Sequence, residues 1–489
     1  MKRSAILYLI IVVFALLPIA GVLKLGSALP SPAGVAAVPG AATTLAKAAP
    51  APAKETGSAL GMMAEGLKQN LKDPLCHLFL QLLLIVAASR MMGRLFTAIG
   101  QPSVVGEMAA GILLGPSLFG MLAPDAFAFV FPETSIGALR LFSQIGVCLF
   151  MFAVGMELNV EHVKHKAHTA VVVSHASIVF PYLLGVGLAY FLSSHLAAPG
   201  TTFVPFALFM GISMSITAFP VLARILQERG LSRTPLGSTA LTCAAVDDVT
   251  AWTILALVVA IARASSLAGA GWNLLLVLLF VAVMVVGVKR VVPRMLGAER
   301  LAEEAPSRGT LAGVVCVVVA SALCTEVIGI HALFGAFLAG AIMPETGGFR
   351  HKLGVRVESF SSVLLLPLFF AFTGLRTQIG LLNSAQDWLV CLAVIAVATL
   401  GKLGGSALAA RLTGMNWCES LQLGALMNTR GLMELIALNI GYDLGILSPR
   451  IFAMLVIMAL ATTMLTGPLL TLFRERCGED EPLPQPVRP

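Results

Sequence analysis

The chain has 489 residues, of which 58% are hydrophobic and only 12% are charged, with a formal net charge of +7. Soluble domains carry about 25% charged residues, so this composition excludes an ordinary soluble protein. The basic residues stand in short clusters between apolar runs, which favours positive-inside membrane orientation over nucleic-acid binding. The eight cysteines show no C-x-x-C spacing, and five lie in apolar runs: Cys148, Cys243, Cys316, Cys324 and Cys391. They predict packing residues, without a disulfide framework or a metal site.

The N-terminal region precedes the main apolar part of the chain. Residues 1–25 carry Lys2 and Arg3 before an apolar run, a pattern typical of either a signal peptide or an extra anchoring helix. Residues 26–74 are rich in Ala, Pro and Gly and predict a flexible extracytoplasmic linker. A transmembrane domain is expected over residues 75–473, followed by a short cytoplasmic tail at 474–489.

Apolar runs of about twenty residues, interrupted by Gly and Pro, predict an all-α polytopic membrane protein rather than a barrel. About thirteen spans are expected after the leader: 75–93, 102–122, 137–156, 169–193, 203–226, 236–262, 272–292, 309–326, 328–344, 358–375, 387–410, 418–440 and 450–473. Pro220 lies inside the fifth span, where it removes a backbone donor and predicts a broken helix.

Loop charge predicts the orientation. If the first span runs inward, nearly all basic loop residues fall on the cytoplasmic side, and the exceptions are Arg263, Arg376 and Arg450. This bias agrees with an odd number of spans and a cytoplasmic C-terminus, as expected for a bacterial inner-membrane protein.

An internal repeat links the two halves of the chain. Residues 149–156 read LFMFAVGM and residues 368–375 read LFFAFTGL, with like residues at most positions, on spans predicted to cross in opposite directions. Such a pair predicts two inverted-topology repeats. The pairing matches the broken fifth span with the twelfth, which carries its own polar stretch around Arg430.

The most informative polar feature is the doublet Asp247-Asp248 inside the apolar sixth span. An ionised group at the middle of a bilayer costs at least about 2.5 kcal/mol, and such groups normally line an ion or substrate path. Consecutive helical residues point about 100° apart, so one aspartate is expected to face a fixed cation and the other a water-filled cavity. A helix cap in a loop is the structural alternative.

Other ionisable residues are expected at membrane depth. Lys402, flanked by glycines that permit close helix approach, is the natural partner for Asp247 or Asp248, although a lysine near a helix end also snorkels. Arg430 and Glu434 are four residues apart and can pair locally, either to stabilise a broken helix or to contact the ion. Glu107 is either an accessory site or an ordinary helix-start carboxylate.

Several stretches of the sequence resemble a known family, the monovalent cation:proton antiporters of the second cation-antiporter group. They are most similar to the plant-type exchangers and their bacterial relatives. The matching stretches are Gln101–Pro116, Phe150–Leu158, Ser215–Leu226, Ala244–Trp252, Leu366–Thr377 and Asn428–Gly441. The resemblance implies crossed, discontinuous fifth and twelfth spans, with Thr217, Asn428 and Thr429 in the broken regions. It also implies a core domain that moves against a dimerisation domain, hence a homodimer in lipid.

The resemblance further implies that Asp248 carries the ion and that Lys402 is the basic partner of Asp247. Plant-type members commonly have Asn at the position of Asp247, so the stoichiometry of those relatives does not transfer. No cytoplasmic nucleotide-binding domain is expected, because no Gly-rich βαβ pattern follows the last span. The leader and linker lie outside the family pattern.

A mechanism follows from the buried acid itself. A carboxylate in a low-dielectric cavity binds either a proton or a small cation, so Na⁺ or K⁺ and H⁺ compete for the same oxygens. Thr217 and unwound backbone near it could supply further oxygens. If Lys402 also releases a proton, the exchange is electrogenic. A proton-independent channel and a symporter on the same fold are the alternatives, and an intramembrane protease would need aspartates on two different helices. No cofactor is expected, and the choice between Na⁺ and K⁺ stays open.

Overall fold

The computed structural model describes residues 18–27, 70, 73–157, 160–232, 234–263, 267–297, 306–345 and 348–477. The regular elements of these residues are helical, and the only bridge among them joins Ala197 and Leu447. Residues 1–17 of the predicted leader, nearly all of the predicted linker and residues 478–489 of the tail lie outside the described residues. Residues 18–27 are largely helical, and Ile19, Val22 and Leu23 pack against the main hydrophobic cluster.

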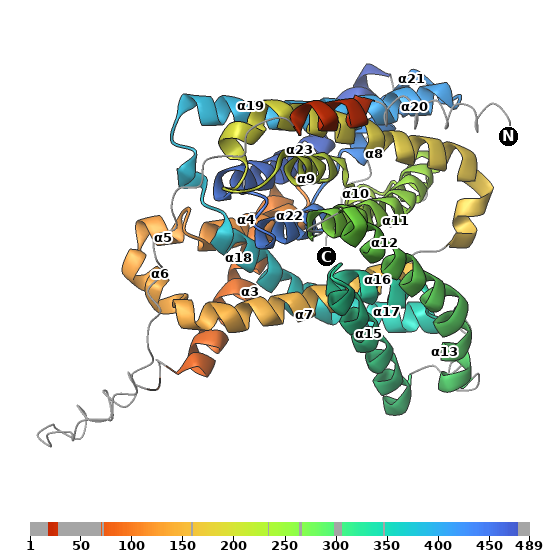
Figure 1. Ribbon diagram of the computed structural model, residues 1–489, viewed down its shortest axis with the longest axis horizontal. Coiled ribbons are helices and arrows are strands. Elements are labelled where there is room, and N and C mark those ends of the chain that lie inside the picture. The colour runs from red at the N-terminus through yellow and green to blue at the C-terminus, as the bar shows by residue number, and fades with distance from the viewer. Residues whose placement is uncertain are drawn as a thin grey trace, which may run out of the picture.

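The helices of the first half alternate long apolar segments with short turns (Figure 1). They are α3 (Pro74–Ala98), α4 (Ser103–Leu114), α5 (Phe119–Leu122), α6 (Pro124–Val130), α7 (Glu133–Glu157), α8 (Val160–Leu196), α9 (Phe203–Ser215), α10 (Phe219–Glu228), α11 (Pro235–Arg263) and α12 (Leu267–Ala282), which continues through a π-helical turn, η1 (Val283–Val288), into α13 (Lys289–Leu296).

The second half has the same character. It contains α15 (Arg308–Ile328), α16 (Ala332–Ala341), α17 (Phe349–Phe360), the π-helical η3 (Ser361–Leu365), α18 (Leu366–Arg376), the short η4 (Ile379–Leu381), α19 (Ala385–Thr399), the π-helical η5 (Leu400–Gly404), α20 (Gly405–Leu412), α21 (Trp417–Met427), α22 (Leu432–Asp443) and α23 (Pro449–Arg476).

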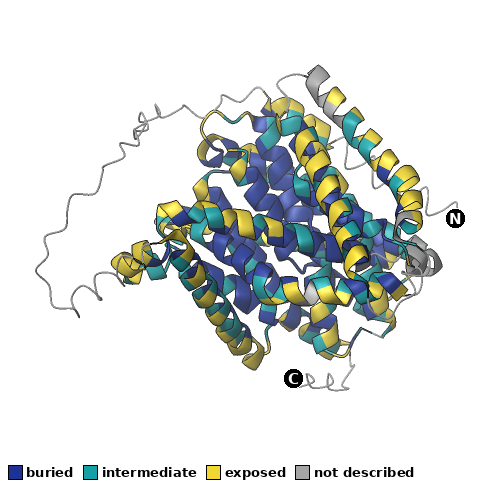
Figure 2. Cartoon of the chain, turned by 90° about the horizontal axis from the view of Figure 1, so that it is seen from below, coloured by how far each residue is buried: buried dark blue, intermediate teal, exposed yellow. Residues whose placement is uncertain are grey.

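Eleven continuous or nearly continuous helical segments among the described residues are long and apolar enough to cross a membrane. The prediction of an all-α polytopic membrane protein is therefore confirmed. Three further apolar helices, α16, α21 and α22, are each too short to cross a membrane alone. The total of thirteen spans therefore stays a prediction. Large apolar side chains are exposed along the outer helices, such as Leu83 on α3 and Val319 on α15, where lipid takes the place of water. Figure 2 shows the buried residues gathered between these outer faces.

The helices pack as two bundles. One, here called the α7 bundle, contains α3, α4, α7 and α15 to α18, which contact one another extensively. The other, the α11 bundle, contains α8 to α11 and α19 to α23. The candidate residues of the sequence lie mainly in the α11 bundle, and the boundary between the bundles runs beside them.

The two repeat-like segments make equivalent contacts in the α7 bundle. A Cβ on Gly155 of α7 would lie 2.2 Å from the Phe337 carbonyl oxygen of α16, and one on Gly374 of α18 would lie 2.0 Å from the Gly111 carbonyl oxygen of α4. Only glycine permits backbones to approach this closely. The matching glycines of the two segments thus permit matching helix crossings, and the two inverted repeats stay a prediction.

Two helices are interrupted in the α11 bundle. The chain is extended at Ile216 and Ala218, between α9 and α10, and it leaves helical conformation at Gly431, between α21 and α22. The Ala218 amide donates to the Thr429 carbonyl oxygen at 3.0 Å, so the breaks touch. The broken fifth span is confirmed, but Pro220 stands in the first turn of α10, where its missing N–H costs nothing. The proline therefore starts a new helix and does not kink an existing one.

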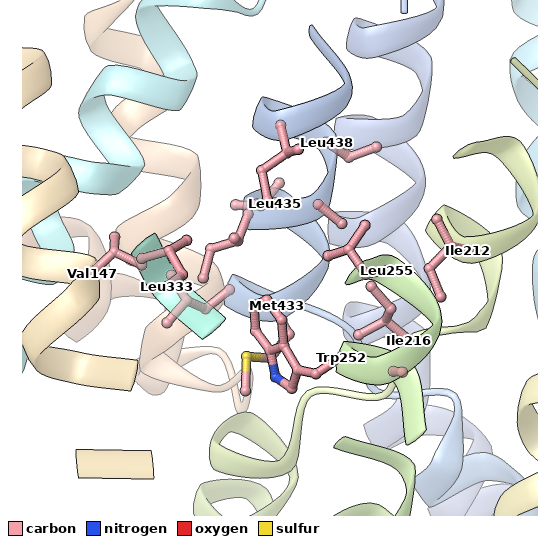
Figure 3. Packing of buried hydrophobic residues seen from close by; sticks show 14 of the residues in the cluster. Val147, Ile212, Ile216, Trp252, Leu255, Leu333, Met433, Leu435 and Leu438 are labelled. Atoms are coloured by element: carbon pink, nitrogen blue, oxygen red, sulfur yellow. The ribbon is translucent and has the colours of Figure 1, made fainter. Parts of the chain in front are cut away.

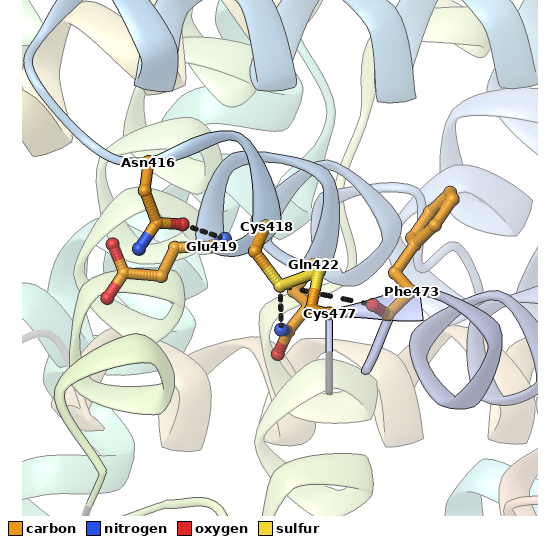
Figure 4. The surroundings of a disulfide bond; sticks show 6 residues. All are labelled: Asn416, Cys418, Glu419, Gln422, Phe473 and Cys477. Atoms are coloured by element: carbon orange, nitrogen blue, oxygen red, sulfur yellow. Dashed lines mark hydrogen bonds between the residues drawn. A yellow bond between two sulfur atoms is a disulfide. The ribbon is translucent and has the colours of Figure 1, made fainter. Parts of the chain in front are cut away.

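One expectation about cysteine is wrong. Cys418, at the start of α21, forms a disulfide with Cys477, which caps the end of α23, across 59 residues of sequence (Figure 4). The spacing of these two cysteines does not reveal the bond because only packing of α21 on α23 brings them together. The other cysteines of the described residues are free.

Candidate functional site

The aspartate doublet lies in the middle of α11, with more than two helical turns on either side. Asp247 is fully buried and Asp248 is 1% exposed. The alternative of a helix cap in a loop is therefore excluded. Both carboxylates lie inside protein, away from lipid, so each needs polar or ionic surroundings to offset desolvation.

Asp247 lies at the centre of a dense polar network. The Lys402 Nζ is 3.0 Å from its Oδ2, the Ser174 hydroxyl donates to Oδ1 at 2.7 Å, and the Ser177 hydroxyl lies 2.8 and 2.9 Å from the two oxygens. The Thr217 hydroxyl donates to Oδ2 as well. A carboxylate held by an ammonium and three hydroxyls is stabilised as an anion and fixed in position.

Lys402 is held as firmly as its partner. It is fully buried and does not snorkel; its ammonium also donates to the Ser215 carbonyl oxygen and lies 3.5 Å from the Ser177 hydroxyl. Glycines bring its helix close to α8, since a Cβ on Gly401 would lie 2.9 Å from the Pro181 Cα. The close approach expected from the flanking glycines is confirmed. Lys402 belongs to η5, and π-helical turns such as this recur at functional sites.

Asp248 lies on a different face of α11 from Asp247. Trp252 follows it by one helical turn on the same face. The Trp252 ring stacks edge-on against Phe334 of α16, with centroids 5.1 Å apart, so this face of α11 meets the α7 bundle. Figure 3 shows Trp252 and Leu255 packed with Met433 of α22 and Leu333 of α16 in the surrounding cluster. Asp248 is thus directed toward the boundary between the bundles.

Arg430 crosses from one broken helix to the other. Its guanidinium donates to the Ser213 carbonyl oxygen at 3.0 Å and to the Met214 carbonyl oxygen at 2.5 Å, while its own amide donates to Thr463. Together with the Lys402 contact to Ser215, two cations satisfy the last carbonyls of α9, where the helix dipole is negative. The buried arginine stabilises the end of a discontinuous helix.

The remaining polar residues of the twelfth span surround the same break. Glu434 is buried in the first turn of α22, 3.5 Å from Arg430, so the local pair expected from their spacing is present. The Thr429 hydroxyl donates to the Leu426 carbonyl oxygen at 2.8 Å and caps α21. Asn428 is fully buried, and its amide oxygen and nitrogen lack hydrogen-bond partners among the described residues.

Glu107 lies elsewhere. It is buried in α4 of the α7 bundle, where its Cγ is 3.7 Å from the position of a Cβ on Gly93 of α3. The structure does not bring it into the network around Asp247.

A cavity of about 760 Å³ opens between the two bundles. Its lining from the α11 bundle includes Val221, the third residue of α10, and Leu432, the first residue of α22. Val104, Phe150 and Phe370 line it from the α7 bundle. The cavity therefore reaches the point where both broken helices resume, on the side that loop charge predicts to be cytoplasmic.

Sequence reasoning missed part of the network. Ser174 and Ser177 of α8 were not singled out, although two hydroxyls three residues apart in an apolar span share a helix face and signal a buried polar partner. Thr463, which bonds both the Arg430 amide and the Arg430 carbonyl oxygen, carries no comparable signal in the sequence.

Comparison with known proteins agrees with this architecture. Residues 82–475 match the family model described as "Sodium/hydrogen exchanger, transmembrane". The "Na(+)/H(+) antiporter NhaS4" of Synechocystis sp. is 45% identical over 80% of this chain and 95% of its own length. The "K(+)/H(+) antiporter 1" of Saccharomyces cerevisiae is 32% identical over 82% of this chain but only 47% of its own length.

A solved structure shows the same fold. The sodium proton antiporter MjNhaP1 of Methanocaldococcus jannaschii superposes with a TM-score of 0.56, covering 86% of this chain and 98% of that one, at 15% identity. Helices, interrupted spans and buried charges together define a multi-pass membrane transporter. The chain belongs to the sodium/hydrogen exchanger family, within the monovalent cation:proton antiporters, and it is not an enzyme.

Proposed function

We propose that the protein exchanges Na⁺ or K⁺ for protons by letting both ions compete for Asp248. The observation that carries this proposal is that the two aspartates of the doublet have different surroundings. Asp247 is held by Lys402 and three hydroxyls, whereas Asp248 faces the boundary between the bundles. A carboxylate that binds either a proton or a metal ion, never both, couples the two gradients.

Asn428 is proposed to assist Asp248. It directly follows Met427, whose carbonyl oxygen lies 3.3 Å from the Thr217 hydroxyl, so it stands next to the Asp247 network. A buried amide without a hydrogen-bond partner in the part of the chain that the structure describes calls for an explanation, and an amide oxygen is a suitable ligand for a partly dehydrated alkali cation. The Thr217 hydroxyl is engaged by Asp247, which leaves the extended backbone around it as the further oxygen source.

Alternating access completes the proposed cycle. The two bundles move relative to each other once Asp248 is neutralised by either ion, and the cavity of about 760 Å³ is the path to the site from one side. Following loop charge, we place this side and the C-terminus in the cytoplasm of a bacterium, with the protein in the inner membrane. A homodimer is proposed on the family resemblance.

Proteoliposomes test the exchange directly. A pH gradient imposed across the membrane should be dissipated by adding Na⁺ or K⁺, and Asp248→Asn should abolish the response while the protein elutes and melts as wild type. Asp125→Asn, which changes an exposed carboxylate in α6, is the matched control and should exchange normally. Full exchange by Asp248→Asn would refute the assignment, and no exchange by the wild type would refute the function.

The charge moved per cycle is a separate proposal. If Lys402 releases its proton when Asp247 turns away, more than one proton crosses for each cation, and the rate responds to voltage by about 2.3 kcal/mol per net charge per 100 mV. Exchange of Na⁺ should then differ between K⁺-free vesicles held at opposite potentials by opposite gradients of thiocyanate, a permeant anion. Equal rates at both potentials would show electroneutral exchange.

A further inference from the structure

The end of α22 farthest from the cavity makes ionic contacts with the opposite bundle. Asp443, its last residue, places Oδ1 2.8 Å from the Arg376 Nη2 at the end of α18 and Oδ2 3.2 Å from the Arg140 Nη2 on α7. Both arginines belong to the α7 bundle, whereas Asp443 belongs to the α11 bundle. One carboxylate therefore ties two helices of one bundle to the other.

Neighbouring side chains strengthen this tie. Asn439, one turn before Asp443, accepts from Arg376 at 3.1 Å and donates to the Thr373 hydroxyl at 2.8 Å. The Arg376 guanidinium also lies 4.2 Å from the ring centre of Phe372 in its own bundle and 5.3 Å from that of Tyr442 in the other. A planar guanidinium held by hydrogen bonds and by ring faces has little freedom to leave.

The cavities at the two ends of α22 are unequal. The cavity at Leu432 measures about 760 Å³, whereas the one lined by Ser143, His331, Asn439 and Asp443 measures about 30 Å³, room for about one water molecule. Leu432 and Asp443 are about 16 Å apart along the helix axis. The space between the bundles is thus wide at the Leu432 end and narrow at the end where Asp443 lies.

We propose that Asp443, Arg376 and Arg140 form a latch that closes one end of the transport path. The latch holds the conformation described here, in which the path is open at the opposite end, and its ion pairs separate each time the bundles move to expose the site to the other side. This proposal rests on the alternating access proposed above.

Loop charge supports a specific role for these groups. Arg376 and Arg450 are exceptions to the positive-inside pattern, and each lies beside a carboxylate, Arg376 beside Asp443 and Arg450 beside Asp387 at 3.7 Å. The Arg450 pair joins α23 to α19 within one bundle, so movement between the bundles does not break it. The Arg376 and Arg140 pairs cross the boundary and do break.

Cross-linking tests the latch. Arg140→Cys combined with Asp443→Cys removes both ion pairs across the boundary and places one thiol on each bundle, and a short membrane-impermeant bis-methanethiosulfonate joins the two positions. Before cross-linking, the variant should exchange cations for protons; after it, exchange should be lost, and a reductant should restore it. Mass spectrometry of the linked peptide measures the yield.

The matched control is Asp387→Cys with Arg450→Cys. Arg450 has the same 45% side-chain exposure as Arg140, but its pair lies within one bundle. Cross-linking this control should leave exchange intact, which accounts for reaction at native cysteines. Unchanged exchange after linkage of positions 140 and 443 would overturn the latch alone, whereas absence of exchange in the wild type would overturn the proposed function.

A second measurement does not depend on the double variant. Asp443→Asn keeps the size of the side chain and weakens both ion pairs, so the closed end should open more often. A cysteine introduced by Gln144→Cys, beside the small cavity, should then react faster with an impermeant maleimide added from that side when Asp443→Asn is also present than when Asp443 is unchanged. An unchanged labelling rate would contradict the proposal.

Discussion

The buried pair of Lys402 and Asp247 can be tested by removing its charges one at a time. Lys402→Met roughly preserves side-chain length but leaves the Asp247 carboxylate without the ammonium 3.0 Å away. Neither side chain is exposed, so water cannot take the place of the lost partner. Breaking such a pair costs about 3–5 kcal/mol of stability, even though three hydroxyls remain on the carboxylate.

Asp247→Asn should cost a similar amount because it leaves the ammonium with only the Ser215 carbonyl oxygen and the Ser177 hydroxyl. The double variant, Lys402→Met with Asp247→Asn, leaves neither member of the pair charged and unpaired. Its loss of unfolding free energy should therefore be smaller than the sum of the two single losses by about 2 kcal/mol or more.

Unfolding in mixed micelles, titrated with SDS and followed by circular dichroism, measures these differences. The surface pair Arg224 and Glu228, 3.2 Å apart with the arginine side chain 44% exposed, provides the matched cycle and should show coupling of about 0.5 kcal/mol at most. If the losses at Lys402 and Asp247 simply add, or couple no more strongly than the surface pair, the pairing described here is not what stabilises the site.

Two further outcomes are expected. Gly374→Ala should destabilise the protein by about 1–3 kcal/mol, because the new Cβ would lie 2.0 Å from the Gly111 carbonyl oxygen. Gly187→Ala is the control and should be neutral or slightly stabilising, because its new Cβ would have no atom within 4 Å. Equal effects of the two variants in a thermal-shift assay would contradict the close crossing of α4 and α18. Maleimide labelling of the SDS-denatured wild-type protein should modify two more thiols after reduction than before it. Cys477→Ser should free the Cys418 thiol and remove that difference. The same number of labelled thiols in the wild type with and without reductant would show that the disulfide is absent.

The sequence by itself determined the features that depend on local composition. Apolar runs of bilayer length predict helices because an unsatisfied backbone is too costly in lipid, so the class of fold could be read without any tertiary information. The same reasoning marked Asp247, Lys402 and Arg430, since a charge inside an apolar run needs a partner wherever that partner lies. Pro220 likewise indicated a broken helix, but the sequence did not show that the break precedes Pro220 and that this proline begins α10.

Tertiary structure alone decided which groups meet. Asp247 is 73 residues from Ser174 and 155 from Lys402, and Asp443 is 303 residues from Arg140. Hydrophobic periodicity cannot choose among such distant pairs, because many helix packings bury the same apolar faces equally well. The direction of Asp248 toward the bundle boundary and the ion pairs of Asp443 arise from one particular packing, which close glycine crossings hold together.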